Sequence, residues 1–185
     1  MAISVLVGPL AWAVGDGTAV AATTTETSLL TSTAASGKWA MPGGFFIAPG
    51  QMLRLTATGR ISTPGATQGN PTFKVKIGSV AVATSPAFAS RISMTTERWV
   101  LTWCLTLRAV GDGTAANFMH VGDFNSVLVS ATNLSNPIPA AATAPAVGTG
   151  FDSSTAATLD LTVTWSNATA GNTITLHQYL LESVI

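Results

Sequence analysis

The stretch Arg98-Trp-Val-Leu-Thr-Trp-Cys-Leu-Thr-Leu-Arg-Ala-Val110 decides the fold class of this chain. Apolar and polar side chains alternate along it, and a repeat of two residues is typical of a β-strand with one buried face. The face predicted to be buried carries Trp99, Leu101, Trp103, Leu105 and Leu107. The opposite face carries Thr102, Thr106 and Arg108.

The same alternation recurs elsewhere, in residues 52–61, 72–85, 118–129, 158–166 and 173–184. Residues 72–85 predict a hairpin around Gly78-Ser79. Residues 118–129 predict either one strand or two strands with Gly122-Asp123 between them. Residues 130–155, rich in Ala, Pro, Gly and Asn, predict a long loop.

Roughly eight to ten short strands with turn signals between them match an antiparallel sandwich, barrel or jelly roll. No convincing amphipathic helix interrupts the pattern. A sandwich accounts for the alternation, because one face of each sheet packs in the core. The predicted core contains Leu53, Leu55, Phe73, Val75, Trp99, Leu101, Trp103, Leu161, Val163 and Trp165.

Composition and charge limit the partners. Only 9% of residues are charged, and eight Lys and Arg balance eight Asp and Glu. Without a basic stripe to displace counterions, nucleic acid is not an expected partner. So few charges protect a monomer poorly against association, and we expect an oligomer. Pro9, Gly15 and Gly17 interrupt the apolar N-terminus well short of a bilayer span, so no membrane partner is expected.

Ionisable groups are too sparse to indicate catalysis. The only imidazoles are His120 and His177, and the only thiol is Cys104, which we interpret as a small buried hydrophobe. Neither a Gly-x-Ser-x-Gly elbow nor a metal-binding motif occurs. Asp16 and Asp112 lie in Gly-Asp-Gly segments, which favour turns over calcium loops. We predict that the chain is not an enzyme and binds no cofactor or metal.

Two further patterns carry predictions. The heptapeptide Ala-Val-Gly-Asp-Gly-Thr-Ala occurs at residues 13–19 and again at 109–115, and we interpret both copies as strand-ending turns. Tryptophans can serve as platforms for sugars, but three of the five are in phase with apolar strand faces. Only Trp12 and Trp39 lie in loop-like contexts.

Several stretches resemble a family of small jelly-roll proteins of tailed bacteriophages. They are Glu26-Thr-Ser-Leu-Leu30, Gly37-Lys-Trp39, Pro42-Gly-Gly-Phe-Phe46, Gly50-Gln-Met-Leu-Arg-Leu-Thr-Ala-Thr-Gly-Arg-Ile-Ser62, Pro145-Ala-Val-Gly-Thr-Gly-Phe-Asp152 and His177-Gln-Tyr-Leu-Leu-Glu182. The resemblance covers residues 26–185 and implies a trimeric, tumour-necrosis-factor-like jelly roll on a virion surface. It brings no catalytic or ligand-binding residues. The fold expected is therefore an all-β, antiparallel jelly-roll β-sandwich.

Residues 1–25 lie outside the resemblance and predict an apolar N-terminal arm, with the jelly-roll domain at residues 26–185. Burying one large apolar side chain contributes about 1.5–3 kcal/mol, so the arm is expected to find a partner surface. The hypothesis is docking on the capsid or on another subunit, for example as a strand added to an open sheet edge. The alternative is that it forms the first strand of its own sandwich. The candidate attachment residues are Ile3, Val5, Leu6, Val7, Leu10 and Trp12.

Together with the low charge, the resemblance implies a bacteriophage capsid decoration (cement) protein. Such a subunit would be a homotrimer on the capsid surface that binds the major capsid protein and stabilises the lattice. One alternative is a tail- or fibre-associated module that recognises a cell-surface glycan. Another is a secreted lectin-like protein, which would lose residues 1 to about 21 as a signal sequence.

Overall fold

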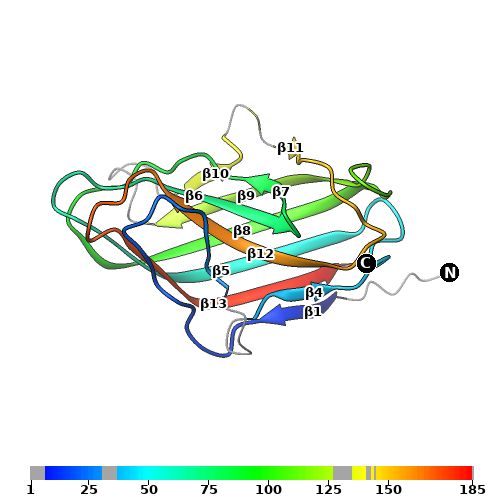
Figure 1. Cartoon of the computed structure of the whole chain (residues 1–185), viewed down its shortest axis with the longest axis horizontal. Helices are drawn as coiled ribbons and strands as arrows, with labels where there is room; N and C mark the ends of the chain where they lie inside the picture. The colour runs from blue at the N-terminus through cyan, green and yellow to red at the C-terminus, as the bar shows by residue number, and fades with distance from the viewer. Residues whose placement is uncertain (1–6, 31–36, 127–134, 141–142, 144, 185) are drawn as a thin grey trace.

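Two antiparallel β-sheets face each other and enclose the core (Figure 1). The computed structural model describes residues 7–30, 37–126, 135–140, 143 and 145–184. All the secondary structure in these residues is β-strand. The predicted all-β, antiparallel sandwich is therefore confirmed.

The larger sheet has eight strands, six of which follow the order β1-β13-β5-β8-β9-β10. The short strands β2 and β11 add to β13 and β9, respectively. The strands are β1 (Val7–Trp12), β2 (Val20–Ala21), β5 (Met52–Thr63), β8 (Met94–Ala109), β9 (Asn117–Ser126), β10 (Ser135–Ile138), β11 (Ala146–Val147) and β13 (Thr173–Val184). Every pairing between them is antiparallel.

The smaller sheet has five strands in the order β3-β12-β6-β7, with β4 also paired to β12. They are β3 (Thr27–Ser28), β4 (Trp39–Met41), β6 (Pro71–Ile77), β7 (Val80–Thr84) and β12 (Ala157–Trp165). The predicted hairpin is present, since β6 and β7 pair across Gly78-Ser79. Gly78 supplies the positive φ, 59°, that a tight hairpin turn requires.

The inner faces of the two sheets form one hydrophobic core. All ten residues predicted to lie in this core are buried, each with 1% or less of its surface exposed. Aromatic rings fill one end, where Phe124 stacks on Phe88 at 4.6 Å between ring centroids and lies 5.1 Å from Phe73. The period-two alternation therefore identified the buried faces correctly.

Strand β9 is continuous, so the two-strand interpretation of residues 118–129 is wrong for the part that the structure describes. Gly122 sits inside the strand, paired to Trp103. A side chain there would overlap the carbonyl oxygen of Thr102 on β8, which explains the need for glycine without a turn.

The segment predicted as a long loop, residues 130–155, also carries short strands. β10 and β11 both pair with β9, and Ala116 forms an isolated bridge with Phe151. The sequence concealed these pairings because each strand is only two to four residues long and lacks an alternating pattern.

The predicted N-terminal arm contributes to the larger sheet. β1 pairs along β13, and β2 extends the same edge of β13. Residues 7–12 thus form an edge strand of the chain's own sandwich, as the alternative interpretation expected. The sheet extends across the boundary predicted at residue 25, because the outer edge of β13 is otherwise unpaired.

Candidate functional site

The outer face of the larger sheet mixes threonines and charged residues with partly exposed apolar side chains. Thr102 pairs with Thr56 on one side and Asp123 on the other, and Thr56 pairs in turn with Leu180. These side chains point away from the core because the residues that alternate with them are buried. The residues of this face on β5, β8, β9 and β13 are Met52, Arg54, Thr56, Thr58, Val100, Thr102, Cys104, Thr106, Met119, Val121, Asp123, Leu180 and Glu182.

The centre of this face is hollowed, and small or apolar residues line it together with Arg54 and Asp123. Gly122 has no side chain, and Cys104 and Thr102 are small, so the sheet surface dips between Arg54 and Val121. Val121 is 44% exposed. The hollow therefore offers an apolar, shape-defined surface of the kind that protein partners cover.

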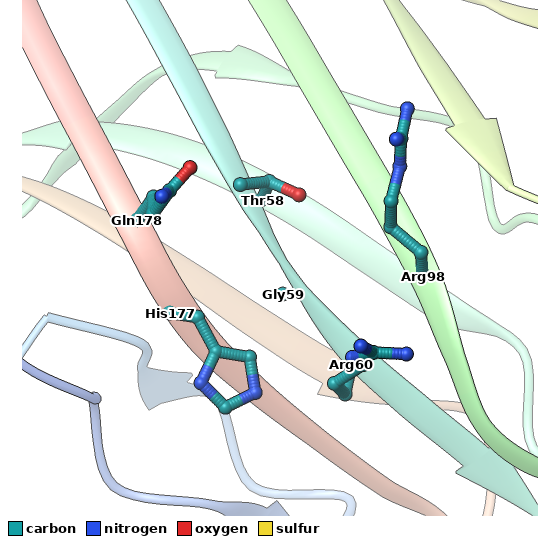
Figure 2. A pocket seen from close by; sticks show the side chains of 6 residues that line it. All are labelled: Thr58, Gly59, Arg60, Arg98, His177 and Gln178. Carbon is teal, nitrogen blue, oxygen red and sulfur yellow. The ribbon is translucent and has the colours of Figure 1, made fainter.

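A second depression, the arginine groove, lies further along the same face. Figure 2 shows His177 and Gln178 of β13 along one side, Arg98 of β8 along the other, and Thr58, Gly59 and Arg60 of β5 between them. Arg60 and Arg98 are both exposed. The groove can therefore offer two guanidinium groups to a ligand from one strand pair.

Two β-bulges shape the arginine groove. The register between β5 and β13 shifts at His177, and that between β5 and β8 shifts between Ile61 and Thr63. A bulge bends a strand and redirects its side chains, which is why bulges are frequent beside binding sites. The second bulge holds Thr96 at a positive φ of 51°, rare for a β-branched residue.

Hydrogen bonds fix both sides of the groove. The Thr96 carbonyl accepts a hydrogen bond of 2.9 Å from Arg60 Nη1, and the Thr96 amide donates to Ser62 Oγ at 2.9 Å. On the opposite side, His177 Nδ1 lies 2.6 Å from Asp16 Oδ1. Asp16 therefore contacts His177, and its segment does not form the predicted turn.

The outer face of the smaller sheet is organised differently. Glu26 accepts hydrogen bonds of 2.7 Å from both Lys74 and Lys76 of β6. These lysines lower the pKa of Glu26 from 4.5 to about 2. Nearby, Asp160 pairs with Lys38 at 2.6 Å and accepts a hydrogen bond from Ser28. The charges of this face are therefore satisfied within the chain.

The other histidine is buried in the core region. Trp103 Nε1 donates a hydrogen bond of 3.2 Å to His120 Nδ1, and burial lowers the pKa of the His120 imidazole. Cys104 is half-buried on the outer face of the larger sheet, so the prediction that it is a small buried hydrophobe is wrong as to burial. Its position follows the period-two rule, since it shares a face with Thr102 and Thr106.

Within the described residues, no cluster of three or more His, Cys, Asp or Glu side chains could hold a metal ion. The same part of the chain contains no helix long and apolar enough to cross a membrane. The predictions of no catalysis and no cofactor remain predictions.

The predicted attachment residues fall in different places. Ile3, Val5 and Leu6 lie outside the described residues. Val7 pairs with Val184, and Leu10 is half-buried against the core. Trp12, 54% exposed, pairs with Leu180 at the edge of the larger sheet's outer face. Trp12 therefore lies on the outer face of the larger sheet, whereas Leu10 packs against the core.

The tryptophans and the repeat need two corrections. Trp39 lies in strand β4 and is buried against Phe45, so it is no exposed platform. Residues 109–115 form the predicted turn, with Gly113 at φ 64°. Residues 13–19 instead run along β13, where Gly17 N donates to Leu176 O at 2.8 Å. Identical sequences differ here because only the first copy meets an open strand edge.

The arginine groove was not predicted from the sequence. Arg60 and Arg98 were visible only as single polar residues on outward strand positions. Their proximity requires the pairing of β5 with β8, in which they are directly opposite. Comparison of the chain with family models, curated proteins and solved structures finds no match.

Proposed function

We propose that this chain is a structural subunit of a virion, a bacteriophage capsid decoration protein of the jelly-roll type. It acts without catalysis, as a homotrimer that binds the major capsid protein on the outside of the shell. The sequence resemblance supports the virion origin. The observation that carries the proposal is the outer face of the larger sheet, whose hollowed centre exposes apolar side chains such as Val121.

The proposed mechanism is adhesion through a shaped surface. Strands lie about 4.8 Å apart and rise about 3.3 Å per residue, so the face from β1 to β9 covers on the order of 600 Å². Each partner in a stable complex contributes about 800 Å². The face therefore supplies most of one such interface. Trp12 at its edge provides a large aromatic side chain of the kind enriched in interface centres.

The copy number of this chain in purified virions tests the proposal. A decoration protein follows the symmetry of the shell and is expected in on the order of hundreds of copies. Quantitative mass spectrometry against the major capsid protein measures this ratio. Only a few copies per particle, as in a tail, would contradict capsid decoration.

The second candidate function is a tail- or fibre-associated module that recognises a cell-surface glycan. The arginine groove favours it, because Arg60, Arg98 and Gln178 present hydrogen-bond donors on an open surface. A low copy number together with binding of virions to host glycans would support this function over decoration.

A further inference from the structure

We propose that the arginine groove binds an acidic saccharide, with its carboxylate or sulfate group held by Arg60 and Arg98. This inference goes beyond capsid decoration and does not depend on it. A decoration protein on the outside of a shell and a tail module would both present such a site to the surroundings.

The first argument is that the lysines and the arginines differ in ion pairing. The three lysines, Lys38, Lys74 and Lys76, each pair with a carboxylate. Among the described residues, by contrast, no ion pair involves an arginine. Arg60 and Arg98 are paired partners on β5 and β8, and both line one depression. Two cations that line one depression favour the binding of an anion there.

The second argument is preorganisation. Arg60 Nη1 donates to the Thr96 carbonyl, and the Arg60 carbonyl accepts a hydrogen bond of 3.2 Å from Trp99 Nε1. Thr96 has a φ of 51°, a strained backbone conformation for a β-branched residue. A strained backbone that orients an exposed arginine is unexplained by stability alone. It reduces the entropy that Arg60 would lose on binding a ligand.

The third argument is the chemistry around the arginines. Guanidinium groups recognise carboxylate and sulfate oxygens through paired N–H donors. Gln178 supplies an exposed amide on the β13 side of the groove, across β5 from Arg98 (Figure 2). Beyond Arg98 the depression continues into a second one lined by Val100, Thr102, Asp123 and Asn125. The hydroxyl of Thr102 and the amide of Asn125 suit the hydroxyls of neighbouring sugar rings, which a simple anion would not contact.

Titration of the full chain with defined probes tests the proposal. The probes are a sulfated heparin tetrasaccharide, a tetragalacturonate, neutral maltotetraose and inorganic sulfate. Nuclear magnetic resonance follows the amide signals of Gly59 and Gln178 and the side-chain Nε of Arg98. At least one acidic tetrasaccharide is expected to shift these signals, at least about tenfold more tightly than sulfate, whereas maltotetraose leaves them unchanged.

Four variants separate a built site from general attraction to positive charge. Arg60→Gln and Arg98→Gln are each expected to weaken binding of the acidic tetrasaccharide about tenfold or more. Arg98→Lys keeps the charge but loses the paired donors, so partial binding is expected. Arg108→Gln removes an exposed arginine of β8 outside the groove and is the matched control, with a change below about twofold.

Each contrary result overturns the proposal. Equal weakening by all three Gln variants would mean that binding depends on net charge. Equal affinity for sulfate and the tetrasaccharides would mean that a simple anion is the ligand. Absence of binding by both acidic tetrasaccharides would remove the site. Unfolding midpoints of the variants, measured in parallel, show whether a lost affinity reflects lost structure.

Discussion

The outer faces of the two sheets handle charge in opposite ways. On the smaller sheet, Lys74 and Lys76 form ion pairs with Glu26, and Lys38 forms one with Asp160. On the larger sheet, Arg54, Arg60, Arg98 and Arg108 lie on β5 and β8, and no ion pair of the described residues involves them. One face is satisfied within the chain, and the other is available to partners.

This difference assigns the charges of the smaller sheet to stability and those of the larger sheet to recognition. The ion pairs of the smaller sheet fasten residues 26–28 to strands far along the sequence, so they serve the fold. The arginine groove of the larger sheet also has internal contacts, the Arg60–Thr96 hydrogen bond and the His177–Asp16 pair, but neither joins an arginine to a carboxylate. Lysines in this chain are therefore structural, and we infer that the arginines of the larger sheet act in binding.

The largest expected effect tests whether both faces rest on one common core. Trp103 lies beneath the larger face and Trp165 beneath the smaller one, and both are buried. Trp103→Ala and Trp165→Ala are each expected to cost about 3–5 kcal/mol of unfolding free energy. Chemical denaturation measures both. A loss below about 1 kcal/mol for Trp103 would mean that the larger sheet is not anchored as described.

An arginine substitution on the outer face of each sheet should next show which of the two faces takes part in self-association. Val121→Arg introduces a cation into the hollow of the larger sheet, whereas Thr84→Arg does so on the exposed edge strand β7. If the larger face joins subunits, Val121→Arg weakens self-association about tenfold or more, because the charge must be desolvated. Sedimentation velocity over a concentration series measures this.

The matched variant Thr84→Arg is expected to leave self-association unchanged. Both variants should keep their unfolding free energy within about 0.5 kcal/mol of wild type, since both positions are exposed. Equal association of the two variants would refute the larger face as the contact between subunits.

Low pH should weaken the ion pairs on the outer face of the smaller sheet. The pKa of Glu26 is about 2 in the folded chain and 4.5 ordinarily, so its ion pairs contribute fully above pH 4.5 and are lost as pH falls toward 2. Glu26→Gln is expected to cost about 1–2 kcal/mol at pH 7, after allowing for partial exposure to solvent. Denaturation curves at pH 7, 4 and 2.5 should show this difference shrinking.

Glu182→Gln on the larger sheet is the control for this pH series. Glu182 forms no ion pair among the described residues, so its replacement should change stability little at any of these pH values. A difference for Glu26→Gln that stays constant from pH 7 to 2.5 would contradict the assigned pKa.

The buried faces of both sheets were predictable from sequence, whereas their outer faces were not. Burial repeats every two residues, so Trp99, Trp103 and Trp165 could be placed in the core without knowing their neighbours. Charge pairing depends on which strands meet. Glu26 reaches Lys74, 48 residues away, and nothing local to either residue indicates it.

The bulges and the edge strand escaped prediction for a related reason. A bulge is a mismatch between two paired strands, so neither His177 nor Thr96 carries a signal in its own segment. The N-terminal residues were judged by their apolar character, which fits an attachment arm and an edge strand equally well. The open edge of β13 decided between these for residues 7–12. The attachment role of the arm stays a prediction.

The smallest expected effect concerns the strain that the larger face carries. Thr96 has a φ of 51°, which glycine adopts without steric cost. Thr96→Gly is therefore expected to raise the unfolding free energy by up to about 1 kcal/mol, with relief of strain outweighing the added freedom of the unfolded chain. Its carbonyl still accepts the Arg60 hydrogen bond, so saccharide binding should persist. Thr25→Gly, at an exposed loop position with no positive φ, is the control and should destabilise slightly. A loss of stability in Thr96→Gly larger than in this control would show that Thr96 is not strained.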